Sequence, residues 1–299
     1  MFKFFNYLTF LILISKMTLI EAKKFFELKL NEQYSQGELN FYYKYILRDC
    51  FNVFPAQLAL NPSLELKNKE IKVLKNIISQ LLNEKPLQYI LGKASFRSLV
   101  LKVNKNVLIP RPETEELVGW IIEDHFQIKN KQMSVLDVGT GSGCIAIALA
   151  KEQDLFNVHA FDRQKVILNL AKENAELNGV NINLFKCDIQ EIKSINLNYD
   201  IIVSNPPYIL PSEKKLMKKN VLDFEPHNAL FVTQKDPLIH YQSIIEFSKT
   251  NLNNNGFLYL EINPKFKREL IDMVDNKCFI ISERKDIFGK DRMLRIQRI

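Results

Sequence analysis

The sequence predicts an α/β domain with a parallel-type sheet, preceded by a small helical bundle and a β-hairpin linker. From residue 134 onward, short β-branched segments alternate with helical ones, which is typical of a sheet covered by helices on both faces. Residues 17–92 instead repeat apolar side chains at helical spacing. Residues 93–110, between them, have the partial two-residue alternation of a hairpin.

The helical region is predicted from three apolar stripes whose members recur every three or four positions. The stripes are Leu19/Ala22/Phe25/Phe26, Leu39/Tyr42/Tyr43/Ile46/Leu47 and Ile71/Leu74/Ile77/Ile78/Leu81/Leu82. Thr18 and Glu21 have the spacing of a capping box, so the first helix is expected to begin directly after Thr18. The segment 86–92 is expected to close the bundle.

Residues 1–16 form an apolar extension before this region. The apolar run is too short to span a bilayer, and no small-x-small cleavage site follows it. The capping box after Met17 favours a functional start at Met17, or a disordered extension, over the alternative of a targeting signal.

The linker hairpin is expected from two apolar segments, 94–103 and 107–109, separated by Asn104-Lys-Asn106. The α/β domain then covers 111–299. Its strands are expected at 135–138, 158–161, 182–187, 200–204, 257–261, 279–282 and 293–297. Helices are expected at 112–126, 144–151 and 165–178. One long irregular segment, 209–236, has the length of a functional lid or binding loop.

Composition narrows the classes of function. The 299 residues, 46% hydrophobic, suffice for two domains with cores. The four cysteines are far apart and the four histidines are scattered, which argues for a reduced, cytoplasmic protein without a metal site. The net charge of +7 permits a nucleic-acid-rich partner such as the ribosome, but lysines on solvated faces explain it equally. Neither sequence-specific nucleic-acid binding nor a membrane is expected.

A glycine loop after the first predicted strand marks a candidate cofactor site. Its residues are Gly139, Thr140, Gly141, Ser142 and Gly143. Glycines let the backbone approach a ligand at the carboxyl ends of the strands. The spacing differs from the dinucleotide pattern Gly-x-Gly-x-x-Gly, and the preceding Asp137 would repel a pyrophosphate but attract an ammonium or sulfonium group. The loop therefore favours S-adenosylmethionine over NAD.

Two further strand ends carry aspartates at the same edge. Asp162, after the second strand, is placed to accept hydrogen bonds from both ribose hydroxyls. Asp188 and Ile189, after the third strand, are placed to meet the adenine amino group and ring. Each aspartate alone is explained equally well as a strand-end cap, but three of them around one glycine loop favour a cofactor site.

The fourth strand ends in Asn205-Pro206-Pro207-Tyr208, the candidate catalytic loop. Each proline holds φ at about −65° and pushes the preceding residue to extended geometry, so the Asn205 amide projects. The Asn205 side-chain oxygen and the Pro206 carbonyl can accept the two hydrogens of an incoming amide, and Tyr208 offers a flat face to it. Such a tetrapeptide is a turn in most chains, and the glycine loop upstream is what favours catalysis.

Together these motifs resemble the HemK/PrmC family, the release factor glutamine methyltransferases. The resemblance runs from Met17 to the C-terminus. The matching stretches are PLQYILG at 86–92, LIPRPETE at 108–115, VLDVGTGSGCIA at 135–146, NPPYI at 205–209, EPHNAL at 225–230 and DIFGKD at 286–291. NPPY alone fits many DNA, RNA and protein methyltransferases, whereas PRPETE combined with EPHNAL is far more specific.

The resemblance implies a Rossmann-like class I methyltransferase domain and a helical domain that binds the substrate. It implies methyl transfer from S-adenosylmethionine to the glutamine side-chain amide in the Gly-Gly-Gln loop of class I peptide chain release factors, by an enzyme expected to be a cytoplasmic monomer. Asn205 would contact both cofactor and substrate. The other substrate residues would be Pro206, Pro207, Tyr208, Arg111 and Glu113, of which Pro206 and Tyr208 join Asn205 in catalysis.

The sequence departs from the family pattern at two places. Arg97-Ser98 stands where the family often has an aromatic–glycine pair, and Ile189 where it often has tryptophan or another large residue. Only local packing and adenine stacking are put in question by these changes.

Three alternatives stay open at this point. A sister enzyme that modifies a glutamine of a large-subunit ribosomal protein normally lacks the Pro-Glu-Thr-Glu continuation. A DNA-adenine or RNA-guanine methyltransferase shares the core but usually carries a recognition domain. A catalytically inactive binding module is disfavoured by the intact glycine loop, Asp162 and Asn205.

Overall fold

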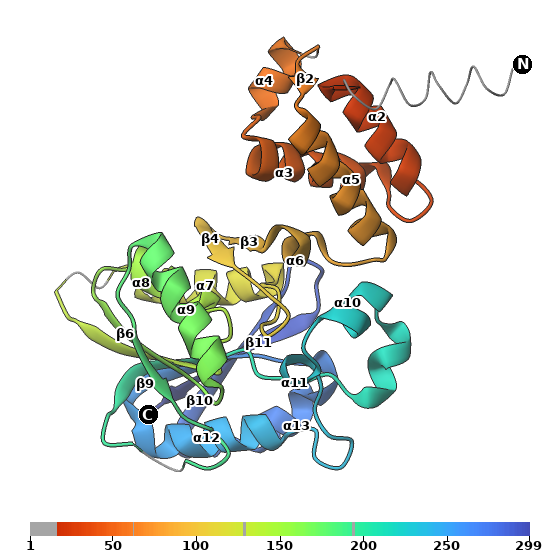
Figure 1. Cartoon of the computed structure of the whole chain (residues 1–299). Helices are drawn as coiled ribbons and strands as arrows, with labels where there is room; N and C mark the ends of the chain where they lie inside the picture. Colours follow the sequence, from red (N-terminus) through yellow and green to blue (C-terminus); the bar gives the residue numbers. More distant parts are fainter. Residues whose placement is uncertain (1–16, 62, 128–129, 193–194) are drawn as a thin grey trace, which may run out of the picture. The chain divides into compact units, whose positions relative to one another are not determined.

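The computed structural model describes residues 17–61, 63–127, 130–192 and 195–299, so the predicted extension 1–16 lies outside the described residues. The chain divides into two compact units, residues 1–91 and 92–299, which are described separately (Figure 1). Within the described ranges, no helix is both long and apolar enough to cross a membrane.

The first unit is a helical bundle with a short two-stranded ribbon. Its elements are β1 (Met17–Thr18), α2 (Leu19–Leu30), α3 (Gln36–Phe51), α4 (Pro55–Leu60), β2 (Glu65–Leu66), α5 (Asn68–Leu82) and α6 (Leu87–Leu91). The predicted capping box is confirmed, because the Thr18 hydroxyl accepts from the Glu21 N–H and the Glu21 carboxylate accepts from the Thr18 N–H. The predicted stripes supply most of the buried core, whereas Phe25 and Tyr42 are partly buried and Leu82 is 42% exposed.

The second unit is built on a seven-stranded sheet with the order β10-β11-β9-β8-β5-β6-β7. Its strands are β5 (Met133–Val138), β6 (Phe156–Asp162), β7 (Asn183–Lys186), β8 (Tyr199–Ser204), β9 (Leu252–Glu261), β10 (Phe279–Lys285) and β11 (Asp291–Arg298). The prediction of a parallel-type sheet holds for β5 to β9 but is wrong for β11, which is antiparallel to both β9 and β10. The connection from β10 to β11 is a short turn, which allows only antiparallel pairing.

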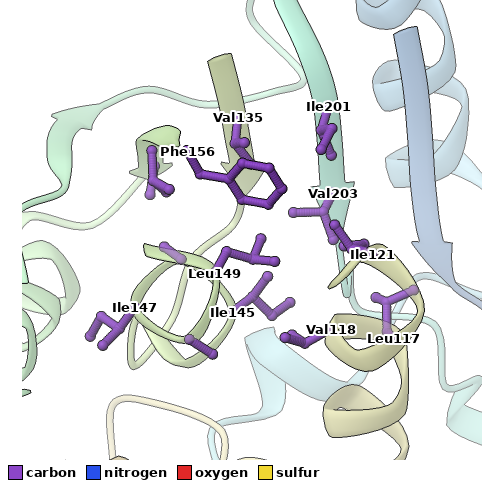
Figure 2. Packing of buried hydrophobic residues seen from close by; sticks show 14 of the residues in the cluster. Leu117, Val118, Ile121, Val135, Ile145, Ile147, Leu149, Phe156, Ile201 and Val203 are labelled. Atoms are coloured by element: carbon purple, nitrogen blue, oxygen red, sulfur yellow. The ribbon is translucent and has the colours of Figure 1, made fainter. Parts of the chain in front are cut away.

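Helices cover both faces of this sheet, as Figure 1 shows. On one face lie α7 (Pro112–His125), α8 (Cys144–Glu152) and α9 (Lys165–Asn178), and on the other α12 (Ile239–Asn251) and α13 (Lys267–Asp272), the latter preceded by the 3₁₀ helix η2 (Pro264–Phe266). Figure 2 shows side chains of α7 and α8 meeting Val135, Ile201 and Val203 of the strands. The intervening Ile202 lies in the opposite core cluster, so the alternation along β8 fixes which face each side chain enters.

The predicted hairpin forms, but its turn is not at residues 104–106. The strands are β3 (Lys93–Phe96) and β4 (Leu99–Lys102), so Arg97 and Ser98 form the turn. Arg97 has a φ of 49°, and its N–H donates to the Glu115 carboxylate over 2.9 Å. Its guanidinium also pairs with Glu152. These tertiary contacts stabilise a left-handed residue that the sequence pattern does not mark as a turn.

The segment 209–236 is not irregular, contrary to the expectation. It contains the 3₁₀ helix η1 (Pro211–Leu216), α10 (Lys219–Phe224) and α11 (His227–Leu230). Its ends are joined by hydrogen bonds from Ile209 N to the Leu230 carbonyl (2.9 Å) and from Val232 N to the Ile209 carbonyl (3.0 Å). Helices this short produce no readable apolar period, which is why the sequence pattern does not reveal them.

Candidate active site

The glycine loop between β5 and α8 has the backbone of a ligand-binding turn. Gly139, Gly141 and Gly143 have φ values of 74°, 56° and 84°. A Cβ built on Gly139 meets no atom within 4 Å, and on Gly141 only the Gly139 carbonyl at 4.0 Å. A Cβ on Gly143 would lie 2.8 Å from Cδ1 of Ile147. The first two glycines therefore leave room for a ligand, whereas the third lets α8 begin close to the loop.

Neighbouring elements hold this loop in place. The N–H groups of Gly139 and Thr140 both donate to the Phe161 carbonyl near the end of β6, over 3.0 and 2.9 Å. The fully buried Asn174 of α9 donates to the Ser142 carbonyl (2.8 Å) and the Lys102 carbonyl (3.0 Å). The linker hairpin is thus connected to the glycine loop through a single asparagine.

Asp137, before the loop, carries an incompletely satisfied buried carboxylate. Its Oδ2 accepts from the Thr140 hydroxyl over 2.6 Å, whereas its Oδ1 is buried and has no well-formed hydrogen bond among the described residues. Burial raises the pKa of Asp137 to about 7, although the Thr140 hydroxyl and the nearby Ala146 N–H act to lower it. An unpaired buried acceptor here suits a cationic ligand group.

Asp162 and Asp188 lie at adjacent strand ends, as the sequence predicts. Asp162 is 8% exposed and accepts from the N–H groups of Gly141 (3.3 Å) and Gln164 (3.1 Å). Burial raises the pKa of Asp162 above its ordinary value. Asp188 accepts from the Gln190 N–H over 3.0 Å, and Ile189 packs against the core cluster of α12. Each carboxylate acts as a local cap, and its role toward a cofactor stays a prediction.

A first cavity of about 150 Å³ collects most of the predicted cofactor residues. Its lining includes Gly139, Thr140, Gly141, Ser142, Asp162, Asp188, Ile189, Asn205, Pro206, Pro207 and Arg111. Gly143 is not in this lining, in agreement with its packing role under α8. The cavity offers open backbone at two glycines, carboxylate acceptors and an apolar side chain in Ile189. Asp137, with its unpaired oxygen, lies two residues before the lining residue Gly139. These features fit S-adenosylmethionine.

The candidate catalytic loop meets a hydrogen-bonded chain of side chains. The Asn205 amide nitrogen donates to the Thr114 hydroxyl (2.9 Å), and Thr114 donates to Oε2 of Glu261 (2.6 Å). The Tyr208 hydroxyl donates to the other oxygen of Glu261 (2.8 Å). Glu261 ends β9 and is 1% exposed, and burial raises its pKa.

A second cavity, of about 210 Å³, adjoins the same loop. Its lining residues are Leu108, Arg111, Asn205, Pro206, Tyr208, Ile209, Met217, Lys218, Val221, Ala229, Leu230 and Glu261. Asn205 and Pro206 line both cavities and so form part of the wall between them. The structure places Tyr208 in the second cavity only, with its hydroxyl directed to Glu261.

Arg111 and Glu113 have different surroundings. Arg111 lines both cavities, and its guanidinium pairs with the buried Glu225, which also accepts from the Ile109 N–H over 3.2 Å. This contact joins the PRPETE and EPHNAL stretches. Because the two stretches are far apart in the chain, the sequence alone does not predict the contact. Glu113 is absent from the described lining of both cavities, whereas its neighbour Thr114 lines the first.

Two residues of the site escape the sequence reasoning. Thr114 sits inside the PRPETE stretch and looks like an ordinary helix residue, and Glu261 looks like the polar end of a strand. The rule that ligands lie at the carboxyl ends of parallel strands is the one signal that could have pointed to Glu261.

Two protein-family models match stretches of this chain. Residues 21–92 match the PrmC N-terminal domain, and residues 121–224 match the Methyltransferase small domain. A Flavobacterium psychrophilum protein named release factor glutamine methyltransferase is 43% identical over 265 residues, which cover 88% of this chain and 93% of that protein. A Lactococcus lactis protein of the same name is 41% identical over 236 residues, covering 78% and 85%.

Among solved structures, a T. thermophilus 16S rRNA N2 methyltransferase in complex with AdoMet and guanosine is similar with a TM-score of 0.50. It is 16% identical and covers 69% of this chain and 50% of that one, so the likeness concerns the fold. The identities and coverage of the sequence relatives go further: the chain belongs to the release factor glutamine methyltransferase family.

Proposed function

We propose that this protein transfers the methyl group of S-adenosylmethionine to the side-chain amide nitrogen of the glutamine in the Gly-Gly-Gln loop of class I peptide chain release factors. It acts as a cytoplasmic monomer, and the release factor is its macromolecular partner. The observation that carries the proposal is the pair Asn205 and Pro206, which lines both cavities.

The first cavity is assigned to the cofactor and the second to the target side chain. S-adenosylmethionine supplies an electrophilic methyl group on a sulfonium. The open glycines line this cavity, and we assign Asp137, which precedes them in the chain, to the cationic end of the cofactor. Asp162 is placed to accept from the ribose, and Asp188 and Ile189 to meet the adenine.

The residues of the catalytic loop suit an amide nitrogen, which is a poor nucleophile because its lone pair is delocalised. Neither Oδ1 of Asn205 nor the Pro206 carbonyl has a hydrogen bond among the described residues, so both can accept from the target NH₂. Two acceptors orient the nitrogen and stabilise the positive charge that grows on it. No base is needed at the start, because the proton leaves after the nitrogen has become acidic.

The substrate cavity also has features that suit a peptide. Its wall is mainly apolar, with Arg111 and Lys218 at its polar edge. Tyr208 lines this cavity while Glu261 holds its hydroxyl, and we assign its ring to pack on the planar amide of the target. We assign the substrate contacts to Asn205, Pro206, Pro207, Tyr208 and Arg111, with Glu113 bracing the pocket from α7.

The test is mass spectrometry of a release factor after incubation with the protein and S-adenosylmethionine. The expected result is one methyl group on the glutamine of the Gly-Gly-Gln loop, and none when that glutamine is replaced by alanine. Methylation of ribosomal protein, DNA or RNA in place of the release factor would contradict the proposal.

The Asn205→Ala variant tests the role of the loop. Its single-turnover rate should fall by about 10²-fold or more, because the lost acceptor matters most in the transition state, whereas cofactor affinity should change much less. Asn205→Asp keeps the size and an acceptor and is expected to retain partial activity. A wild-type rate for Asn205→Ala would show that the loop is merely structural.

A further inference from the structure

The chain Asn205–Thr114–Glu261 has a direction that follows from its chemistry. A carboxylate can only accept hydrogen bonds, so the Thr114 hydroxyl donates its single hydrogen to Glu261, over 2.6 Å. The Thr114 oxygen is then left as an acceptor toward Asn205, 2.9 Å away. Only the NH₂ end of the Asn205 amide can satisfy it, and the oxygen end keeps no hydrogen-bond partner among the described residues.

We propose that Glu261, acting through Thr114, is a positioning residue that selects the orientation of the Asn205 side-chain amide in which its oxygen faces the target nitrogen. The proposal rests on the proposed function. The reversed orientation would present two N–H groups to the NH₂ of the substrate, donor against donor, and would remove an acceptor from the reacting nitrogen.

The same carboxylate orients a second residue of the loop. Its Oε1 accepts from the Tyr208 hydroxyl over 2.8 Å, while Oε2 serves Thr114. The Tyr208 carbonyl is held separately by Asn263, whose amide donates to it over 3.1 Å. One buried glutamate therefore sets the acceptor at one end of the Asn-Pro-Pro-Tyr loop and the ring at the other.

The surroundings of Glu261 act on its pKa in opposite directions, and burial, the largest influence, raises it. Arg292, held by Asp286 and the Ile262 carbonyl, lies with its guanidinium 5.9 Å from the centre of the Tyr208 ring and favours the ionised carboxylate. Burial and the charge of Glu113 oppose ionisation. Among the described residues, Tyr208, Tyr241 and Cys144 also interact electrostatically with Glu261. A protonated Glu261 could donate to Thr114, which would reverse the direction of the hydrogen bonds from Glu261 to Asn205. The proposed positioning role therefore requires that Glu261 is ionised.

The central test replaces Thr114 by valine, which has the same shape but no hydroxyl. The single-turnover methylation rate should fall by about 10- to 100-fold, as expected for a misplaced reacting partner, while the dissociation constant of S-adenosylmethionine changes by less than about threefold. Thr114→Ser restores the hydroxyl and should recover most of the rate. The matched control is Ser248→Ala on α12, which removes a buried hydroxyl that donates to Ile245 and lines neither described cavity.

A double-mutant cycle separates orientation from packing. Aspartate at 205 presents an acceptor in either rotamer, so Thr114→Val should reduce the rate far less in the Asn205→Asp background than in the wild type. An equal loss in both backgrounds would overturn the proposal and leave Thr114 as a packing residue. So would a wild-type rate for Thr114→Val.

Proton exchange of the Asn205 side chain tests the inference without requiring methylation of any substrate. The side-chain NH₂ of Asn205, assigned in an NMR spectrum by its absence from Asn205→Asp, should exchange its protons with solvent faster in Thr114→Val. Unchanged exchange would contradict the hydrogen-bonded chain whatever the substrate. Failure of the wild type to methylate a release factor would instead count against the proposed function alone.

Discussion

At the scale of single residues, the site is built on buried carboxylates used in different ways. Asp162 is satisfied by backbone N–H groups, Glu261 by two hydroxyls, and Asp137 by one hydroxyl with its second oxygen unpaired. An unpaired buried acceptor lowers the stability of the free protein and is compensated when a cation binds.

The first prediction concerns Asp137, whose pKa burial raises to about 7. A cationic ligand favours the ionised form, so S-adenosylmethionine should bind more weakly as the pH falls below about 7, with release of a proton on binding. Calorimetry in two buffers of different ionisation enthalpy measures that proton. Asp137→Asn should bind weakly and release none, and an unchanged proton count in this variant would contradict the assignment.

The sign of the stability effect follows from the same pKa. Because the folded-state pKa of Asp137 lies above its ordinary value of 3.8, its contribution to stability is present below that value and lost as the pH rises through about 7. Asp137→Asn should therefore raise the free energy of unfolding of the cofactor-free protein in mildly alkaline buffer. Trp120, the one tryptophan, lies in the core of the second unit and reports its unfolding by fluorescence.

A second prediction concerns Asp162. Asp162→Ala should weaken S-adenosylmethionine binding by roughly 1–3 kcal/mol, since it leaves ribose hydroxyls without their acceptor. It also removes the hydrogen bond from the Gly141 N–H, so unfolding should be measured beside affinity. Calorimetry that finds wild-type affinity would rule out the ribose assignment.

At the scale of elements, the PRPETE stretch at the start of α7 connects the site to other segments through side-chain contacts. In the stretch before and within α7, Arg111 pairs with Glu225, Thr114 reaches Glu261, and Glu116 accepts from the Ile287 N–H over 3.2 Å. The turn between β10 and β11 is itself organised by Asp286, which accepts from the N–H groups of Phe288 and Lys290. The segment around Glu225 and the turn between β10 and β11 are therefore both connected to the start of α7.

The element-scale prediction tests the close approach of α8. Gly143→Ala should lower the free energy of unfolding by about 2 kcal/mol or more, because it combines a left-handed backbone with a Cβ only 2.8 Å from Ile147. Gly179→Ala is the matched control, since Gly179 has a φ of 67° but no atom within 4 Å of a Cβ. The control should lose about 1–2 kcal/mol from its backbone alone. Equal losses for the two variants would show that the packing of α8 is not tight there.

At the scale of the whole molecule, the candidate site lies within one of the two units. Both cavities lie between residues 106 and 292, within the second unit. The hydrogen-bonded chain Asn205–Thr114–Glu261 and its neighbour Arg292 lie in the same range. The helical first unit has its own apolar core and caps, and the family match to a PrmC N-terminal domain covers residues 21–92 of the chain. The domain boundaries expected from the sequence, at 92 and 110, stay predictions.

The prediction at this scale concerns the extension. A chain that begins at Met17 should fold and methylate as the full chain does, because the described structure starts with Met17 paired to Leu66 and Thr18 capping α2. Thermal unfolding and single-turnover rates of the two chains provide the comparison. Lost solubility or activity without residues 1–16 would indicate that the extension has a role of its own.

Features whose signals are local can be predicted from the amino-acid sequence alone. Helical stripes, the capping box at Thr18, the strands of the sheet, the glycine loop and Asn-Pro-Pro-Tyr all depend on residues a few positions apart. The aspartates at strand ends needed one more rule, that carboxyl ends of parallel strands meet at one edge. These features sufficed to predict the cofactor site and the loop beside it.

Features that depend on partners far away in the chain become visible only in the folded structure. Thr114 and Glu261 are 147 residues apart, and neither has a local pattern that announces the other. The hairpin turns at Arg97 because Glu115 and Glu152 bind that residue, and β11 runs antiparallel because its connection is short. Long-range hydrogen bonds and ion pairs have no sequence period, so the direction of the Asn205 amide becomes visible only once the fold brings α7 and β9 together.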